Sequence, residues 1–182
     1  MNRKTAMKLF GLLGLLMLLS CGYADRHRNS SLCEQALVDS LEVRVQDSLF
    51  SNVHYSRSQL LEALTQTQDS LVYYRLLALY GKTFFVSSDF DSILYYNRRV
   101  KEFSRNASQS SESLQSPRWN DVLSDVYNIE GNVWMQLNRP DSAIIDYKKA
   151  YGYRLEGKKL HLLPDICINI ADAYLHRSDL AH

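Results

Sequence analysis

The ionisable side chains of this 182-residue chain form no catalytic motif that we recognise. The sequence has no glycine-rich phosphate loop, no Gly-x-Ser-x-Gly nucleophile motif and no His-Glu-x-x-His zinc motif. Its histidines are dispersed, at His27, His54, His161, His176 and His182. Asp165, Asn169 and Asp172 share one face of a predicted helix, as a strip that either contacts a ligand or is simply solvated. We therefore expect no enzyme, no metal and no cofactor.

Cys21 is the residue whose surroundings imply a covalent modification. A basic head precedes an apolar segment, residues 9–19, and the head carries Arg3, Lys4 and Lys8. Such a head and a short apolar run are typical of an export signal, and the run is shorter than the roughly 20 residues of a membrane span. The ending Leu18-Leu19-Ser20-Cys21 resembles a lipobox, at which signal peptidase II cleaves and the cysteine receives lipid, such as palmitate. A plain secretory signal with a coincidental cysteine is the alternative.

This resemblance implies a signal peptide over residues 1–20, a tether over 21–31 and one folded domain over 32–182. The mature chain would be a lipoprotein of the cell envelope that faces the periplasm, with the choice between inner and outer membrane left open. Removing the three basic groups of residues 1–20 changes the net charge from +1 to −2. A nearly neutral chain gives no electrostatic reason to expect nucleic acid as a partner.

The other two cysteines, Cys33 and Cys167, are far apart in the sequence. Outside the cytoplasm they could pair. Cys167 lies in an apolar stripe with Ile166 and Ile170, however, and we expect it to be a buried free thiol.

The hydrophobic pattern predicts an all-α fold, because apolar residues recur every three or four positions. The longest stripe contains Val122, Val126, Ile129, Val133 and Leu137. Two others cover residues 71–84 and 90–103, and shorter ones cover 32–49 and 60–64. We expect the last helix over residues 165–177.

The stripes repeat in pairs. Gly81 precedes Phe84 by three residues and an Asp-Ser pair by ten, and Gly131 has the same spacing to Trp134 and to a second Asp-Ser pair. A third copy begins at Ala171, where alanine takes the place of the glycine. Each unit is predicted to be a helix, a turn of three or four residues and a second helix.

These units resemble the tetratricopeptide repeat, most closely over residues 127–151. The resemblance implies a solenoid of helical hairpins, about three repeats with the last incomplete, in which small residues face large ones where helices cross. The packing positions are Gly81, Phe84, Gly131, Trp134, Ala143, Tyr147, Ala150, Ala171 and Tyr174. There are departures: Glu130 and Tyr80 replace the usual leucine, and Ile93 replaces a small residue.

The resemblance implies a scaffold or sensor input that binds a peptide or protein partner through its concave face. Residues expected to face that groove are Arg75, Lys82, Asn128, Asn132, Met135 and Gln136. About a third of the repeat-region tyrosines are also expected there, with Trp134 as a core wedge and Trp119 as a contact beside a loop. Because the last repeat is unfinished, the alternative is the N-terminal sensory fragment of a membrane-bound histidine kinase or transcriptional regulator.

An Asp-Ser-aliphatic triplet occurs five times, with its serines at Ser40, Ser48, Ser70, Ser92 and Ser142. Asp and Ser favour helix N-termini, where they cap free amides. The triplets also resemble an acceptor motif for O-linked glycans on exported bacterial proteins. Helix capping and glycosylation therefore remain alternative interpretations.

Overall fold

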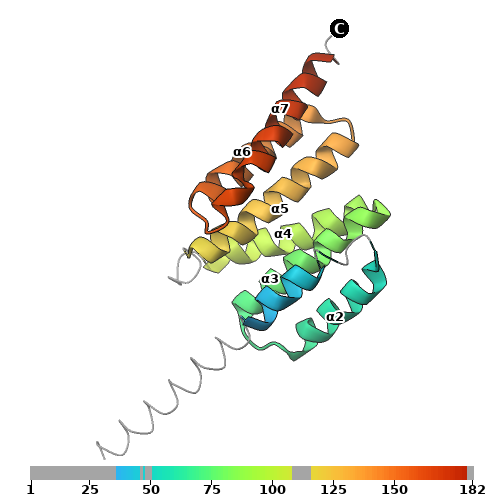
Figure 1. Cartoon of the computed structure of the whole chain (residues 1–182), viewed down its shortest axis with the longest axis vertical. Helices are drawn as coiled ribbons and strands as arrows, with labels where there is room; N and C mark the ends of the chain where they lie inside the picture. Colours follow the sequence, from blue (N-terminus) through green and yellow to red (C-terminus); the bar gives the residue numbers. More distant parts are fainter. Residues whose placement is uncertain (1–35, 46, 48–50, 108–115, 180–182) are drawn as a thin grey trace, which may run out of the picture. The chain divides into compact units, whose positions relative to one another are not determined.

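The computed structural model describes residues 36–45, 47, 51–107 and 116–179, and it is all-α over these ranges (Figure 1). No strand occurs in the described residues, so the prediction of an all-α fold is confirmed for this part of the chain. None of the described helices is long and apolar enough to cross a membrane. The predicted signal peptide, the tether, Cys21, Cys33 and Ser48 lie outside the described residues.

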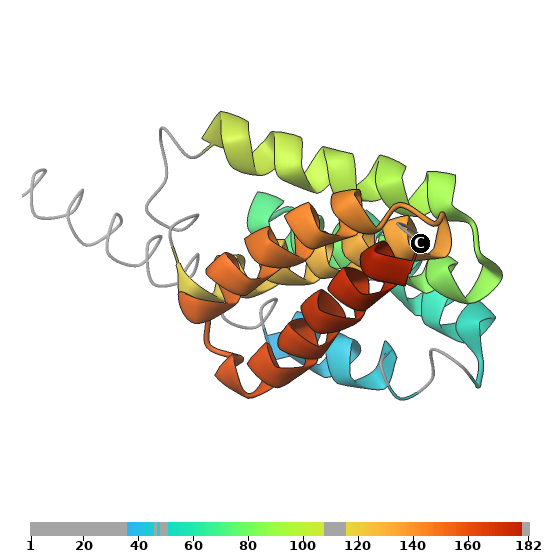
Figure 2. The same ribbon diagram turned by 90° about the horizontal axis from the view of Figure 1, so that it is seen from above.

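The chain divides into two compact units, residues 1–40 and residues 41–182. In the first unit the described residues, 36–40, are helical, and in the second the helical residues 41–45 precede the named elements. These elements are α2 (Val53–Gln66), α3 (Ser70–Lys82), the 3-10 helix η1 (Thr83–Ser87), α4 (Phe90–Ala107), α5 (Pro117–Gln136), α6 (Pro140–Leu155), the 3-10 helix η3 (Leu160–Leu162) and α7 (Leu163–Asp179). Sequence neighbours α5 and α6, and then α6 and α7, pack side by side (Figures 1 and 2).

Side-chain caps fix where several helices begin. The Asn52 side chain accepts a hydrogen bond from the backbone of Tyr55 and caps α2. Asp69 accepts from the amides of Leu71 and Val72, at 2.8 and 3.2 Å, and caps α3. Proline occupies the first position of α5 and of α6, where its missing N–H costs nothing.

The Asp-Ser triplets do not all cap helices as predicted. Asp69 is an N-cap, but α4 is capped by Asp89, whose carboxylate accepts from the Ser92 amide at 3.1 Å and from the Ser92 hydroxyl at 2.7 Å. Asp91 and Asp141 lie inside first turns, where a negative charge meets the positive end of the helix dipole. Capping is wrong for Ser40, which lies within the helical residues 36–45 and donates to Leu37 O.

The repeat in the sequence has a counterpart in the backbone. Ser88 and Asn138, which are as far apart as Gly81 and Gly131, are the non-glycine residues with positive φ in the described part of the chain, at 53° and 56°. Each ends a helix with the same pair of hydrogen bonds. Ser88 donates to Phe85 O and Asp89 to Phe84 O, as Asn138 donates to Met135 O and Arg139 to Trp134 O. This is the Schellman arrangement, and here it uses serine and asparagine instead of glycine.

Two glycines lie where consecutive helices approach closely. A Cβ added at Gly81 of α3 would stand 2.9 Å from Tyr96 Cβ on α4. One added at Gly131 of α5 would stand 2.3 Å from Tyr147 Cε1 on α6. Contacts this short force the neighbour to move, so both crossings depend on the missing side chain.

Among the described residues, hydrophobic clusters join helices to one another. The first joins α3, α4 and α5 through Leu77, Val100, Trp119, Leu123 and Val126. The second joins α4 to α5 through Ile93, Ile129 and Val133, and the third joins α6 to α7 through Ala143, Ile144, Tyr147 and Ala173. Trp134 packs against the third cluster. The expectation for Trp119 was wrong, because it is 2% exposed and belongs to the core.

The outer side of α7 departs from the predicted packing. Cys167 is a free cysteine and is exposed, so the predicted burial of its thiol is wrong. Ala171, predicted as a packing position, is exposed as well. Tyr174, the other packing position predicted on α7, is 37% exposed, and the Lys148 ammonium of α6 lies 5.4 Å from the centre of its ring. α6 and α5 contact α7 on its buried side, which holds Ile166 and Ala173, and Cys167 and Ala171 face away from it.

Candidate partner-binding surface

Amide side chains of α5 and α7 meet along the junction of these helices. Asn169 of α7 donates to Asn128 of α5 at 3.1 Å, and both side chains are half-buried. One turn further along α5, Asn132 accepts from the Tyr147 hydroxyl at 2.7 Å. Gln136 lies on the next turn and is exposed. We refer to Asn128, Asn132, Gln136 and Asn169 as the amide strip.

A buried tyrosine supports the amide strip. Tyr147 is 2% exposed, and burial, together with the nearby Asp172 carboxylate, raises the pKa of its hydroxyl. The hydroxyl therefore stays protonated and keeps donating to Asn132. At the end of α5, His176 Nε2 lies 2.8 Å from Asn138 Oδ1, which adds a second link to α7.

The predicted groove residues do not form one surface. Asn128, Asn132 and Gln136 follow one another along α5, but Met135 packs against the cluster between α6 and α7. Lys82 is half-buried in the last turn of α3. Arg75 was expected to face a partner, and this is wrong for the described structure. It is 8% exposed, and its guanidinium lies 4.0 Å from the Glu42 carboxylate.

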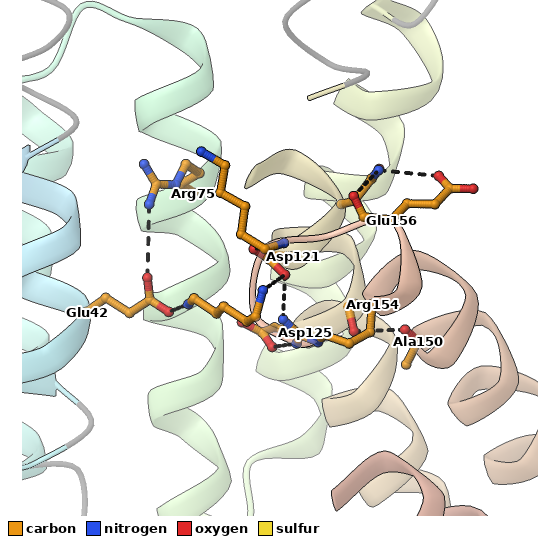
Figure 3. A network of polar contacts seen from close by, with 11 residues as sticks. Glu42, Arg75, Asp121, Asp125, Ala150, Arg154 and Glu156 are labelled. Carbon is orange, nitrogen blue, oxygen red and sulfur yellow. Dashed lines mark hydrogen bonds and ion pairs between the residues drawn. The ribbon is translucent and has the colours of Figure 1, made fainter. Parts of the chain in front are cut away.

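A buried ion pair that the sequence did not reveal joins α5 to the end of α6 (Figure 3). Arg154 is 1% exposed, and its guanidinium donates to Asp121 Oδ1 at 2.8 Å and to the Asp125 carboxylate. Arg154 Nε is buried without a partner in the described residues. Ser124 donates to Ala150 O at 2.8 Å and adds a neutral link beside the pair.

Asp121 also holds the turn between α6 and α7. Its carboxylate accepts from the amides of Lys158 and Lys159, at 3.0 and 3.1 Å. A Cβ at Gly157 would stand 2.2 Å from Asp121 Oδ1, so only glycine lets the turn come this close. The carboxylate thus gathers three donors at one point and fixes the start of α7.

Lys159 extends this network to the helical residues 41–45. Its ammonium group pairs with the Glu42 carboxylate, which also faces Arg75 (Figure 3). In this network, each basic side chain (Arg75, Arg154 and Lys159) lies beside an acidic one, so the charges offset one another. Asp121 and Arg154 are 33 positions apart in the sequence, and Asp121 and Lys159 are 38 apart. Gly157 is a local signal that could have indicated a close approach in this turn.

A second set of charges lies between α4, α5 and α6. Lys101 of α4 donates to both carboxylate oxygens of Glu130, at 2.7 and 2.6 Å, and Glu130 is 3% exposed. Burial raises the pKa of Glu130, and the bond to Lys101 partly offsets that effect. On α6, Asp146 accepts from Trp134 Nε1 at 2.8 Å and from Lys149 at 3.0 Å.

Tyr127 lies within this second set. The ammonium groups of Lys101 and Lys149 stand 5.2 and 5.0 Å from the centre of its ring, which stacks on Tyr153. Burial raises the pKa of Tyr127 to about 12. The described residues contain no group of three or more His, Cys, Asp or Glu side chains placed to hold a metal ion. The charged groups that the structure brings together are instead paired with one another.

No protein-family model matches the chain, and neither a curated protein nor a solved structure is significantly similar to it. Its function is therefore inferred from the sequence patterns and the geometry described above.

Proposed function

We propose that the chain is a lipid-anchored helical-repeat protein, of the tetratricopeptide type, that binds a peptide or protein partner without catalysing a reaction. It would serve as a scaffold or as the input of a sensor at the cell envelope. The observation that carries the proposal is the amide strip, in which Asn128 of α5 is hydrogen-bonded to Asn169 of α7 and Asn132 to Tyr147 of α6.

The repeat assignment draws support from three features that recur at one and the same spacing along the chain. They are the close crossings at Gly81 and Gly131, the left-handed turns at Ser88 and Asn138, and the helix starts of α4 and α6. A hairpin that recurs in this way buries its hydrophobic face against its neighbours. Such stacking leaves one side of the helices open to a partner.

The chemistry of the amide strip suits an extended polypeptide. An amide side chain both donates and accepts hydrogen bonds, and so matches the N–H and C=O groups of a peptide backbone. Asp165 and Asp172 are exposed on α7 and add negative charge near the strip. The favoured ligand is a polar peptide segment that carries at least one basic side chain.

The anchor would be the lipid on Cys21, which holds the domain at a membrane, and the cell envelope is the proposed location. Acyl chains bind a bilayer through about 0.8 kcal/mol per buried methylene, so several chains hold a domain durably. The Asp-Ser motifs remain a second proposed modification, and the intact mass of the exported protein decides it. The absence of added sugar mass would rule out glycosylation.

A pull-down from membranes of the native host tests the binding proposal. The bait is the mature chain, and the test variant carries Asn132→Ala and Gln136→Ala. The matched control carries Arg98→Ala and Glu102→Ala at exposed positions of α4. We expect the control and the wild type to retain the same partner and the strip variant to lose it, with melting curves showing that all three are folded. Equal recovery by all three baits would contradict a role for the strip.

A further inference from the structure

The outer face of α7 is apolar and uncovered. Ile168 and Leu175 are each 66% exposed, and Ala171 lies exposed between them. These residues follow one another at helical spacing, so they form a continuous stripe. Asp165 and Asp172, both exposed, border the stripe on one flank. Large apolar side chains gathered in this way mark a surface that takes a partner.

The internal repeat identifies what kind of element covers such a face. Aligning Gly131 with Ala171 also places Trp134 on Tyr174. The same alignment places Asp125 on Asp165 and Met135 on Leu175. On α5 these positions contact α6: Gly131 lies under Tyr147, Asp125 pairs with Arg154, and Met135 packs against the cluster that contains Ala143.

Residues that are buried on α5 also correspond to residues that are buried on α7. Val126 of α5 is 1% exposed and its counterpart Ile166 is 2% exposed, while Val133 and its counterpart Ala173 are both fully buried. The two helices therefore present equivalent faces to their surroundings. Asp125, Gly131 and Met135 of α5 lie against α6. Their counterparts on α7, Asp165, Ala171 and Leu175, are exposed.

Charge specifies the helix that fits this face. Asp125 receives the guanidinium of Arg154 from α6, and Asp165 offers a carboxylate at the equivalent position. A basic residue on a docking helix would form an ion pair with the Asp165 carboxylate. Two copies of this chain packed antiparallel through α7 would instead bring the same acidic flank of each copy together, because a two-fold interface pairs a patch with itself.

Shape adds a second requirement. On α5 the ring of Tyr147 occupies the space in which a Cβ at position 131 would lie. Ala171 carries that Cβ, so a tyrosine ring cannot lie as close to α7. The incoming helix therefore has a smaller side chain at this crossing.

We propose that the outer face of α7, formed by Asp165, Ile168, Ala171 and Leu175, docks a basic amphipathic helix of a partner protein. The helix runs antiparallel to α7, as α6 does to α5. It carries a basic residue opposite Asp165 and a small residue opposite Ala171. Asp165 borders both this face and the amide strip, but Ile168, Ala171 and Leu175 do not belong to the strip, and docking at this face does not depend on peptide binding there.

Titration of the full chain with labelled peptides tests the proposal. The probe copies residues 139–156 with Tyr147→Ala, and a second peptide keeps the tyrosine. We expect saturable binding of the alanine probe to the wild type, and at least tenfold weaker binding of the tyrosine peptide. The Ala171→Gly protein should recover binding of the tyrosine peptide.

A charge swap locates the contact. Asp165→Arg should lower the affinity for the alanine probe at least tenfold. A probe that also carries Arg154→Asp should restore binding to the Asp165→Arg protein. Glu102→Lys on α4 is the matched control and should leave affinity unchanged. Failure of the probe to bind, or a loss that the swapped charge does not repair, overturns the proposal. A dimer of the wild type that Ile168→Ser dissociates would assign the face to a second copy instead.

Discussion

The ring of Tyr147 lies directly over the backbone of Gly131, so that an added Cβ would stand 2.3 to 2.8 Å from three ring atoms. The hydroxyl of the same ring reaches Asn132, the next residue of α5. One side chain thus sets both the distance between α5 and α6 and the base of the amide strip. The packing of α5 against α6 and the proposed binding surface therefore depend on the same contact.

Replacing Gly131 with leucine should destabilise the protein by about 3 kcal/mol or more, because the ring has no room to retreat. Gly152 on α6 provides the matched control, since a Cβ there meets nothing within 4 Å. Gly152→Ala should stabilise the protein by about 0.5–1 kcal/mol through reduced chain entropy. Urea denaturation measures both, and a Gly131→Leu protein as stable as the wild type would refute the crossing.

Asp121→Ala should cost about 3–5 kcal/mol, because it leaves the buried guanidinium of Arg154 without its buried partner and frees two turn amides. Asp125 also pairs with Arg154, but its side chain is 36% exposed. Asp125→Ala should therefore cost no more than about 1 kcal/mol. Equal losses in thermal denaturation would mean that Asp121 does not anchor the turn.

We expect Asp89, and not Asp91, to provide the N-cap that stabilises α4. Asp89→Ala should lower the Tm, whereas Asp91→Ala should change it little. The bonds from Ser92 lower the pKa of Asp89 below its ordinary value of 3.8. The stabilisation is therefore complete above that value and disappears as the pH falls through the lowered pKa. A Tm difference between wild type and Asp89→Ala that persists in strong acid would contradict this assignment.

Glu130 should make stability depend on pH in the opposite direction. Its pKa is raised above 4.5, so between 4.5 and the raised value the folded state holds a proton that the unfolded state has lost. The free energy of unfolding of the wild type should then fall with rising pH, relative to that of Glu130→Gln. Exposed Glu102→Gln is the control. If both variants show the same slope, Glu130 is not the responsible group.

Replacing Cys21 with serine should remove the site of lipidation and leave an uncleaved or soluble form. Fractionation of the native host, with the wild type alongside, measures the change. Membrane association that is unaffected by the substitution would refute the anchor.

Local patterns predicted those features that depend on residues near in sequence. Helical spacing located the helices, and the repeated glycines marked the close crossings at Gly81 and Gly131. The ring that meets Gly131 is that of Tyr147, however, and not that of Trp134 as predicted. The ends of the hairpins followed from the same repeat, although the left-handed residues are Ser88 and Asn138 and not glycines. These features could be predicted because each is determined within one or two helical turns.

The features that the sequence did not reveal depend on contacts between distant residues. Arg75 resembled a surface cation until the fold placed Glu42 beside it, and nothing near Asp121 indicated Arg154 as its partner. Trp119 follows a polar segment but packs into the core beside Phe103, with its indole N–H donating to Ser104 at 3.0 Å. Cys167 belongs to an apolar stripe that is wider than the face its neighbours cover, and so it lies exposed.

A photo-crosslinking residue at position 136 tests the proposed binding surface most directly. Gln136 is exposed at the end of the amide strip, and Glu102, exposed on α4, gives the comparison position. In membranes of the native host, the proposal predicts a discrete crosslinked partner from position 136 and none from position 102. Crosslinks from position 102 alone, or the same products from both positions, would contradict it.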